Sequence, residues 1–214
     1  METISLYNTL PKVFAGRTDI AGDVWLKELE LKKGHTYLVE ANSGTGKSSL
    51  LSYIYGFRRD YDGEILFDRK DISHLSIKQW TQLRKKSLSL LWQELRLFPE
   101  LTAMENVRIK NNLTRFQSKK TIEQWFDQLG ISNRRDTLVD KMSFGQQQRV
   151  ALIRALCQPF DFIFADEPVS HLDDTNSNIM AEILLNEARR QGAAVIVTSI
   201  GKRLNIDYDK VLKL

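Results

Sequence analysis

Cysteine and histidine are scarce in this sequence of 214 residues, which contains one cysteine and three histidines. Cys157 lies in a helical apolar pattern, so we interpret it as a small buried hydrophobic residue of a protein from a reducing compartment. The histidines, His35, His74 and His171, lie too far apart in the sequence to indicate a metal cluster.

Long apolar runs and a strong charge bias are also missing. No stretch approaches the roughly 18 apolar residues that a membrane span requires, and Met1–Ile4 lacks the basic start and apolar core of a signal sequence. The net charge of +4 is mild, and the basic pairs are spread along the chain, which favours solvated faces over a nucleic-acid surface. We expect a cytoplasmic chain that binds no nucleic acid and reaches the cytoplasmic face of the inner membrane only through a partner.

What the sequence does contain is a phosphate-binding loop between an apolar run and an apolar-striped helix. It fits the pattern GxxxxGK[ST], except that Ala41 stands at the first glycine. Glycines at 44 and 46 let backbone N–H groups turn toward phosphate oxygens, Lys47 supplies a positive charge, and Ser48 offers a hydroxyl to Mg²⁺. A glycine-rich surface turn is the alternative, which the flanking strand and helix disfavour. The predicted nucleotide contacts are Ala41, Asn42, Ser43, Gly44, Thr45, Gly46, Lys47, Ser48 and Ser49.

The alternation of strand and helix patterns predicts an α/β fold with a mainly parallel sheet and helices on both faces. Strands are expected near residues 29–31, 36–40, 64–67, 87–92, 160–165, 194–197 and 211–212. Asp62-Gly63 reads as the turn into the third of these. Helices are expected from Lys47 to Gly56, over 121–129, over 146–157 with Ser143 as cap, and from a cap at Asp174 to Gly192.

The chain is long enough for a large core, and one domain with a subdomain fits its length better than two independent domains. Residues 1–93 and 158–214 are expected to form a nucleotide-binding core with an N-terminal antiparallel β subdomain. The mostly helical stretch of about 94–157 lies between two predicted strands of this core. It is therefore a candidate inserted helical subdomain.

A second acidic motif follows the apolar run of 160–165. Asp166 ends that run and is placed to bind the Mg²⁺ that accompanies a nucleotide, while Glu167 lies beyond the strand end and can polarise an attacking water. The alternative is an ordinary acidic pair that caps a turn. The phosphate loop upstream favours the catalytic interpretation.

Four motifs in the right order resemble the nucleotide-binding subunit of an ABC (ATP-binding cassette) system over nearly the whole chain. Ala41–Ser48 resembles its Walker A loop, Met142–Arg149 (MSFGQQQR) resembles the signature LSGGQxQR, and Phe164–Asp173 (FADEPVSHLD) resembles Walker B running into the D-loop. Gln93 with the stretch after it resembles the Q-loop. The compact length and the motif sequences are most similar to the cassettes of lipoprotein-release, macrolide-export and cell-division systems.

This resemblance implies a P-loop NTPase fold, ATP and Mg²⁺ as cofactors, and a dimer in which each ATP lies between one chain's Lys47 loop and the other chain's Ser143 helix start. Gln93 would sense Mg²⁺ and water, and the loop after it, near residues 98–104, would contact a membrane permease. Phe14 is the candidate for stacking on adenine, although an ordinary core phenylalanine is an equal alternative. The resemblance assigns Lys47, Gln93 and Glu167 to catalysis, Ser48, Gln93 and Asp166 to metal binding, and Ser143, Gly145, Gln146 and Asp173 to the partner's nucleotide.

Three positions depart from the family pattern. Ala41 and Phe144 replace glycines at positions where we expect tolerance. Ile200 stands where the family has a histidine that contacts the γ-phosphate, and its side chain can neither donate nor accept a hydrogen bond. Losing such a group lowers a rate by about 100- to 1000-fold. His171 can compensate across the dimer, or it is merely a tolerated loop residue.

The leading interpretation is an ATPase subunit that energises a separate permease. The alternative, which Ile200 favours, is an ATP-dependent clamp or signalling module of the cell-division type that turns over slowly. A cytosolic ABC protein of translation or DNA repair is disfavoured, because the chain lacks paired cassettes and long coiled insertions. Nothing in the sequence indicates the transported substrate.

Overall fold

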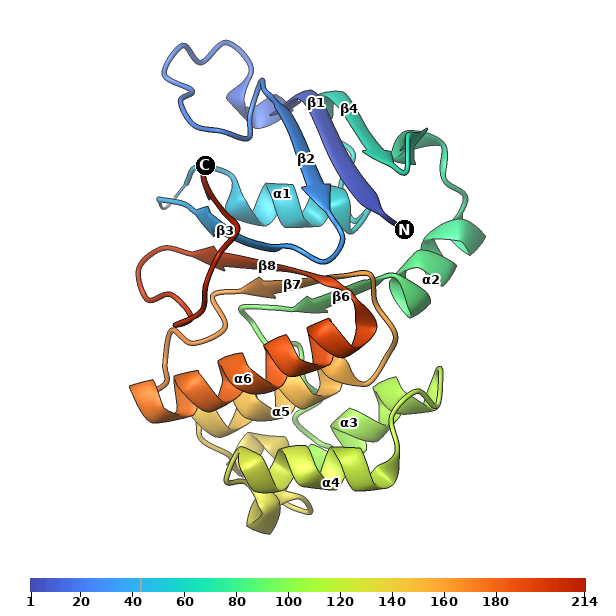
Figure 1. Cartoon of the computed structure of the whole chain (residues 1–214), viewed down its shortest axis with the longest axis vertical. Helices are drawn as coiled ribbons and strands as arrows, with labels where there is room; N and C mark the ends of the chain where they lie inside the picture. The colour runs from blue at the N-terminus through green and yellow to red at the C-terminus, as the bar shows by residue number, and fades with distance from the viewer. Residues whose placement is uncertain (43) are drawn as a thin grey trace.

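A parallel sheet of five strands, in the order β6-β7-β8-β3-β9, forms the centre of the computed structural model, which describes residues 1–42 and 44–214 (Figure 1). Neighbouring strands pair in parallel throughout, with Leu38 opposite Val197 and Phe164 opposite Ile196. The strands are β3 (Thr36–Glu40), β6 (Leu88–Leu91), β7 (Phe162–Asp166), β8 (Ala194–Ser199) and β9 (Lys210–Lys213).

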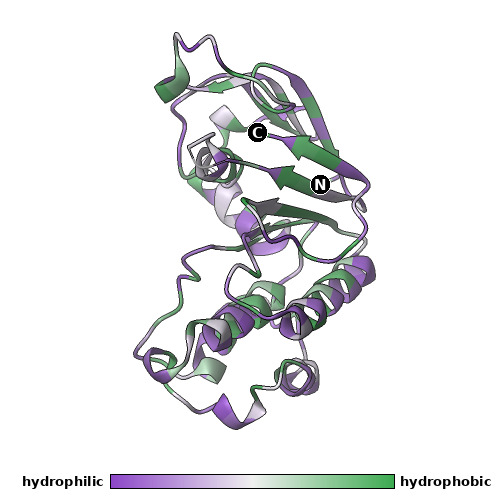
Figure 2. Cartoon of the chain, turned by 90° about the vertical axis from the view of Figure 1, so that its left-hand side faces the viewer, coloured by the Kyte–Doolittle hydropathy of each residue, from purple (hydrophilic) through white to green (hydrophobic). Residues whose placement is uncertain are grey.

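Both faces of this sheet are covered, because successive side chains of a strand point to opposite sides. In β7, Ile163 and Ala165 pack with the helices on one side, whereas Phe162 and Phe164 pack toward the antiparallel sheet on the other. Figure 2 accordingly shows strands that are hydrophobic along most of their length. The apolar runs of the sequence are therefore two-sided core strands, as predicted.

A second, antiparallel sheet lies above the first in the order β2-β1-β4-β5, so the predicted N-terminal β subdomain is confirmed (Figure 1). Its strands are β1 (Thr3–Pro11), β2 (Glu28–Lys32), β4 (Tyr61–Phe67) and β5 (Lys70–Asp71). Helix α1 (Lys47–Ile54) lies between the two sheets.

The other face of the parallel sheet is covered by α5 (Phe144–Leu156) and α6 (Asp174–Gln191), with α3 (Ala103–Asn112) and α4 (Lys119–Gln128) beyond them (Figure 1). Helix α2 (Ile77–Lys86) connects the antiparallel sheet to β6. Among the described residues, no helix has the length and apolar character needed to cross a bilayer.

Three local expectations are wrong or incomplete. Asp62-Gly63 is not a turn: both residues lie inside β4, opposite a register shift in β1, and a Cβ on Gly63 would lie 2.4 Å from the Asn8 carbonyl oxygen. The cap of α6 is Asp173 rather than Asp174, since the Asp173 carboxylate accepts from the Asn176 N–H at 2.9 Å. Helix α2 is not predicted by the sequence pattern, because it buries only Trp80 and so shows no continuous apolar stripe.

Candidate nucleotide-binding site

The loop between β3 and α1 has the backbone that phosphate binding requires. Gly44 and Gly46 have φ of +82° and +99°, and Gly46 caps the N-terminus of α1 in the left-handed conformation. A Cβ on Gly46 would lie 3.0 Å from the Phe14 ring and 3.1 Å from the Trp25 ring. Ser43, a predicted contact, lies outside the described residues.

Hydrogen bonds within the loop, to Trp25 and to the end of β8 hold this loop in place. The Thr45 hydroxyl donates to the Asn42 carbonyl at 2.9 Å, and the Trp25 indole N–H donates to the Thr45 carbonyl at 2.8 Å. The Ala41 N–H donates to the Ser199 carbonyl at 3.0 Å, which ties the loop start to the end of β8. The Ser49 hydroxyl accepts from the Arg58 guanidinium at 3.0 Å.

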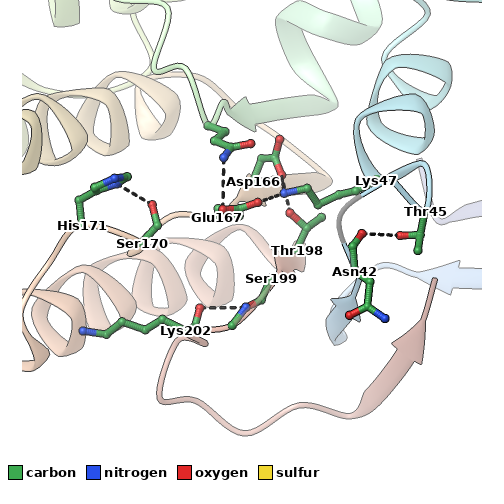
Figure 3. Close-up of polar contacts among 12 residues, drawn as sticks. Asn42, Thr45, Lys47, Asp166, Glu167, Ser170, His171, Thr198, Ser199 and Lys202 are labelled. Atoms are coloured by element: carbon green, nitrogen blue, oxygen red, sulfur yellow. Dashed lines mark hydrogen bonds and ion pairs between the residues drawn. The ribbon is translucent and has the colours of Figure 1, made fainter.

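The lysine and the acidic pair meet at the carboxyl ends of the strands (Figure 3). Lys47 Nζ lies 3.3 Å from Asp166 Oδ1 and forms an ion pair with Glu167 Oε1. The Gln93 side-chain amide donates to Glu167 Oε2 at 3.2 Å. Parallel strands end at one edge of the sheet, so β3, β6 and β7 bring these four residues together although they lie up to 120 positions apart.

Asp166 is held from the neighbouring strand by a residue that sequence reasoning missed. Thr198 stands directly opposite Asp166 in the parallel pairing of β7 with β8, and its hydroxyl donates to Asp166 Oδ1 at 2.5 Å. Both side chains are buried. The only sequence signal is the register of the two apolar strands, which fixes the carboxylate that Thr198 faces.

Glu167 has φ of +46°, the left-handed region that non-glycine residues rarely adopt. Its N–H still donates to the Thr198 carbonyl at 3.2 Å, so the backbone leaves the sheet abruptly at this point. The turn aims the carboxylate back at Lys47 and Gln93 (Figure 3). A strained backbone of this kind is common where a side chain has to be aimed at a site.

A cavity of about 450 Å³ opens beside the loop. Its lining combines residues predicted to bind nucleotide and metal with two apolar residues, Val13 and Ile200, of which Ile200 is 49% exposed. The lining residues are Val13, Phe14, Asn42, Gly44, Gly46, Lys47, Ser48, Ser49, Gln93, Glu167 and Ile200.

Phe14 lies at one end of this cavity beside Gly46, but its ring is only 9% exposed. The Arg17 guanidinium lies 5.0 Å from the ring centroid and covers part of it. Stacking of Phe14 on adenine, which would require Arg17 to move, therefore stays a prediction.

The signature residues lie apart from this cavity, at the start of α5. Ser143 and Gln146 form a reciprocal capping box: the Ser143 hydroxyl accepts from the Gln146 N–H at 3.3 Å, and the Gln146 side chain accepts from the Ser143 N–H at 3.1 Å. Gly145 packs so closely that a Cβ there would lie 3.0 Å from Leu172. Hydrogen bonds from the Asn176 backbone and side chain lower the pKa of Asp173, which caps the neighbouring α6.

Known proteins match this arrangement over most of the chain. A family model described as ABC transporter matches residues 26–170. The ABC transporter ATP-binding protein YbbA of Escherichia coli strain K12, named as uncharacterized, is 32% identical over 190 residues, or 87% of this chain and 83% of YbbA. The lipoprotein-releasing system ATP-binding protein LolD of Novosphingobium aromaticivorans is 31% identical over 189 residues, or 87% of this chain and 84% of LolD.

Among solved structures, the dimeric structure of MJ0796, described as a bacterial ABC transporter cassette, superposes with a TM-score of 0.78. It is 25% identical, and the match covers 92% of this chain and 88% of that one. The predicted fold and family resemblance are confirmed, including the similarity to lipoprotein-release cassettes. The chain therefore belongs to the ABC transporter family, as an ATP-binding domain of the ABC ATPase type.

Proposed function

We propose that two copies of this chain close on Mg²⁺-ATP and that its hydrolysis drives a separate membrane permease. The observation that supports this most strongly is the cluster of Lys47, Asp166, Glu167 and Gln93 beside a glycine loop. It places a phosphate-binding cation, a metal-binding carboxylate and a candidate general base at one cavity.

The residues fit magnesium because the donors offered here are hard oxygen ligands. Ser48 and Gln93 line the cavity, and Asp166 is fixed by Thr198 at the strand end. Among the described residues no group of three acidic, histidine or cysteine ligands forms a closed metal cage. Mg²⁺ would therefore arrive with the nucleotide, where it neutralises phosphate charge.

Hydrolysis requires Glu167 to leave Lys47. The Glu167 carboxylate pairs with the cation that the β- and γ-phosphates need, so phosphate binding would compete with this ion pair and free the base. Glu167 then accepts a proton from a water placed by Gln93. Because Ile200 offers the γ-phosphate no hydrogen bond, we expect slow turnover by the isolated chain.

A second copy is needed because the signature residues are directed elsewhere. Ser143 begins a 13-residue helix whose N-terminus attracts anions, yet it has no contact with Lys47, Asp166 or Glu167 among the described residues. Two copies arranged head to tail would place each Ser143 over the partner's phosphates. The dimeric structure of the MJ0796 cassette supports the pairing of two copies.

The permease, we infer, contacts the loop that follows Gln93 and thereby holds the chain at the cytoplasmic face of the inner membrane. Phe98, Pro99 and Glu100 are exposed there, whereas Ala103 and Met104 at the end of the predicted segment are buried. The exposed Phe57 ring lies 5.4 Å from Trp92 and extends the surface toward α1. We propose residues 94–157 as the helical unit that transmits movement from this loop.

This surface also carries a cation over its aromatic rings. The Arg96 guanidinium lies 3.5 Å from the Trp92 ring centroid, and its side chain is 52% exposed. Glu94 is 3.9 Å away, too far for a strong pair. The chemistry fits a permease segment that presents an apolar side chain to Phe57 and Phe98 and a carboxylate to Arg96.

Turnover of Mg²⁺-ATP by the purified chain tests the proposed activity. We expect a measurable rate that Lys47→Ala and Glu167→Gln each abolish, and a rate at least tenfold higher for Ile200→His. A wild-type rate equal to that of Glu167→Gln would contradict the proposed hydrolysis.

Co-purification with a multi-span membrane protein, whose gene we expect beside this one, tests the docking surface. Arg96→Glu should reduce the captured ratio at least tenfold, whereas Arg134→Glu, an exposed change of the same charge, should leave it unchanged. Equal capture by both variants would exclude the surface at Arg96 as the docking site.

The alternative function, an ATP-dependent clamp or signalling module, finds no support in the comparisons, where the relatives are named as transporter ATP-binding proteins. Ile200 remains the one feature that favours slow hydrolysis, and slow hydrolysis is compatible with a transporter whose permease accelerates it.

A further inference from the structure

The nucleotide cavity has an apolar residue where a polar contact to the γ-phosphate is expected. Ile200 follows β8, is half-exposed and lines the cavity together with Lys47 and Glu167. The last polar side chains of β8 are engaged elsewhere: Thr198 donates to Asp166, and the Ser199 hydroxyl donates to the Lys202 carbonyl at 2.9 Å. This side of the cavity therefore offers the phosphate no side-chain donor from β8.

A histidine lies outside this cavity, beside the signature motif. The His171 ring makes an edge contact with the Phe144 ring, with centroids 4.6 Å apart and planes at 69°. Its Nδ1 bonds to the Ser170 hydroxyl at 2.9 Å. These two contacts fix the plane of an exposed imidazole, and its Nε2 has no hydrogen-bond partner among the described residues.

His171 does not serve the cavity of its own chain. His171 does not line that cavity, and Figure 3 shows its ring beyond Ser170, apart from Lys47 and Glu167. It lies instead with the start of α5, because Phe144 immediately follows Ser143 and the His171 carbonyl lies 3.6 Å from a Cβ built on Gly145. His171 therefore lies beside the two residues that follow Ser143 in the signature motif.

We propose that His171 contacts the γ-phosphate of the ATP held by Lys47 of a second copy of this chain, and so replaces the polar group that Ile200 lacks. This inference rests on the head-to-tail dimer of the proposed function. It also gives Phe144 a role: the ring that replaces a small signature residue supports the imidazole from one side. The partner chain would then supply the hydrogen-bond donor that Ile200 cannot supply in the chain that binds the ATP.

The imidazole would act on the charge that develops during hydrolysis. With Nδ1 bonded to Ser170, an Nε2–H can donate to a γ-phosphate oxygen, and such a donor is most effective when it is already oriented before the reaction. Glu167 stays the general base in the chain that binds the ATP. His171 catalyses by stabilising the transferring phosphoryl group.

Single variants separate the donor from the packing. His171→Ala and His171→Phe should each lower kcat for Mg²⁺-ATP by about 100-fold, although phenylalanine keeps the contact with Phe144. His171→Asn, which retains an N–H donor, should keep more activity than either. Unchanged kcat in both His171→Ala and His171→Phe, at an unchanged thermal midpoint, would overturn the inference.

Mixing two inactive variants tests whether the contact is made in trans. In a mixed dimer of His171→Ala with Lys47→Ala, one site pairs an intact Lys47 with an intact His171, so an equimolar mixture should recover about a quarter of the wild-type rate. Lys47→Ala mixed with Glu167→Gln is the control, because those two residues act in the same chain and no intact site can form. Failure of the first mixture to exceed this control would show that His171 acts in cis or not at all.

Rescue distinguishes this inference from the proposed function. Ile200→His in the His171→Ala background should restore kcat at least tenfold, since it returns a donor to the same phosphate from the other side. An active wild-type chain that is insensitive to His171 contradicts this inference alone. A wild-type chain no more active than Lys47→Ala contradicts the proposed function itself.

Discussion

At the scale of single residues, the predicted phosphate-binding lysine forms ion pairs with the two predicted acidic residues of the site. Lys47 is 7% exposed and Asp166 is 4% exposed, and the Lys47 ammonium pairs with the carboxylates of both Asp166 and Glu167. A buried lysine without a carboxylate partner would be costly. In the proposed reaction, phosphate oxygens compete with Glu167 for Lys47, and the carboxylate that they displace becomes free to act as the base.

This competition predicts tighter ATP binding when the charge of Glu167 is removed. In Glu167→Gln, Lys47 keeps Asp166 but loses its second carboxylate partner, and the phosphates lose a repelling neighbour, so the Kd for Mg²⁺-ATP should fall at least tenfold, about 1.4 kcal/mol. Isothermal titration of the purified variants measures it. Glu182→Gln removes an exposed carboxylate on α6 and should leave the Kd unchanged. An unaltered Kd in Glu167→Gln would show that the ion pair does not oppose binding.

Residue identities at the site can be predicted from the sequence, but their mutual contacts cannot. The spacing of the motifs assigns Lys47, Gln93, Asp166 and Glu167, because phosphate and Mg²⁺ chemistry requires those groups at strand ends. The pairing of Glu167 with Lys47 depends on the left-handed backbone of Glu167. No local sequence pattern predicts this backbone conformation.

At the scale of elements, the long core strands and capped helices follow from pattern, whereas edge features do not. The runs that become β7 and β8 are apolar on both faces, which is visible in sequence. Gly63 resembles a turn residue because glycine favours turns. In the fold it sits within β4 against the Asn8 carbonyl, and only the pairing with β1 explains it.

Where α3 packs on α5, the burial of Lys110 lowers the stability of the fold, and a substitution can remove this penalty. Burial, with the Arg154 guanidinium nearby, lowers the pKa of Lys110 from its ordinary 10.5 to about 8. Below pH 8 the lysine is protonated in both folded and unfolded chains, and the folded state bears the full penalty. Lys110→Met should therefore increase the free energy of unfolding at pH 7, by about 1 kcal/mol or more.

The sign of the pH dependence provides the check. Between pH 8 and 10.5 the unfolded chain holds a proton that folded Lys110 has released, so wild-type stability gains from rising pH and the advantage of Lys110→Met shrinks. Urea unfolding at about pH 7 and about pH 9.5 measures both values. Lys120→Met, at an exposed position of α4, should show no such change. An advantage that grows with pH would contradict the assignment.

At the scale of the whole molecule, three helices begin on one side. In Figure 1, α1, α5 and α6 all start at the left-hand edge, the edge where the strands of the parallel sheet end. Their positive ends and Lys47 therefore share one face. A single chain uses only α1 for its own phosphate loop, so the α5 start is available for a nucleotide bound elsewhere.

We predict that Mg²⁺-ATP joins two chains across this face. Glu167→Gln, which holds ATP without hydrolysing it, should sediment at about twice 24.8 kDa with Mg²⁺-ATP and as a monomer without it. Ser143→Asp in that background should abolish the dimer, because aspartate still caps α5 but repels the γ-phosphate. Ser118→Asp makes the same change at the cap of α4 and should leave the dimer intact. If both aspartate variants dimerise equally, the signature helix does not contact the partner's nucleotide.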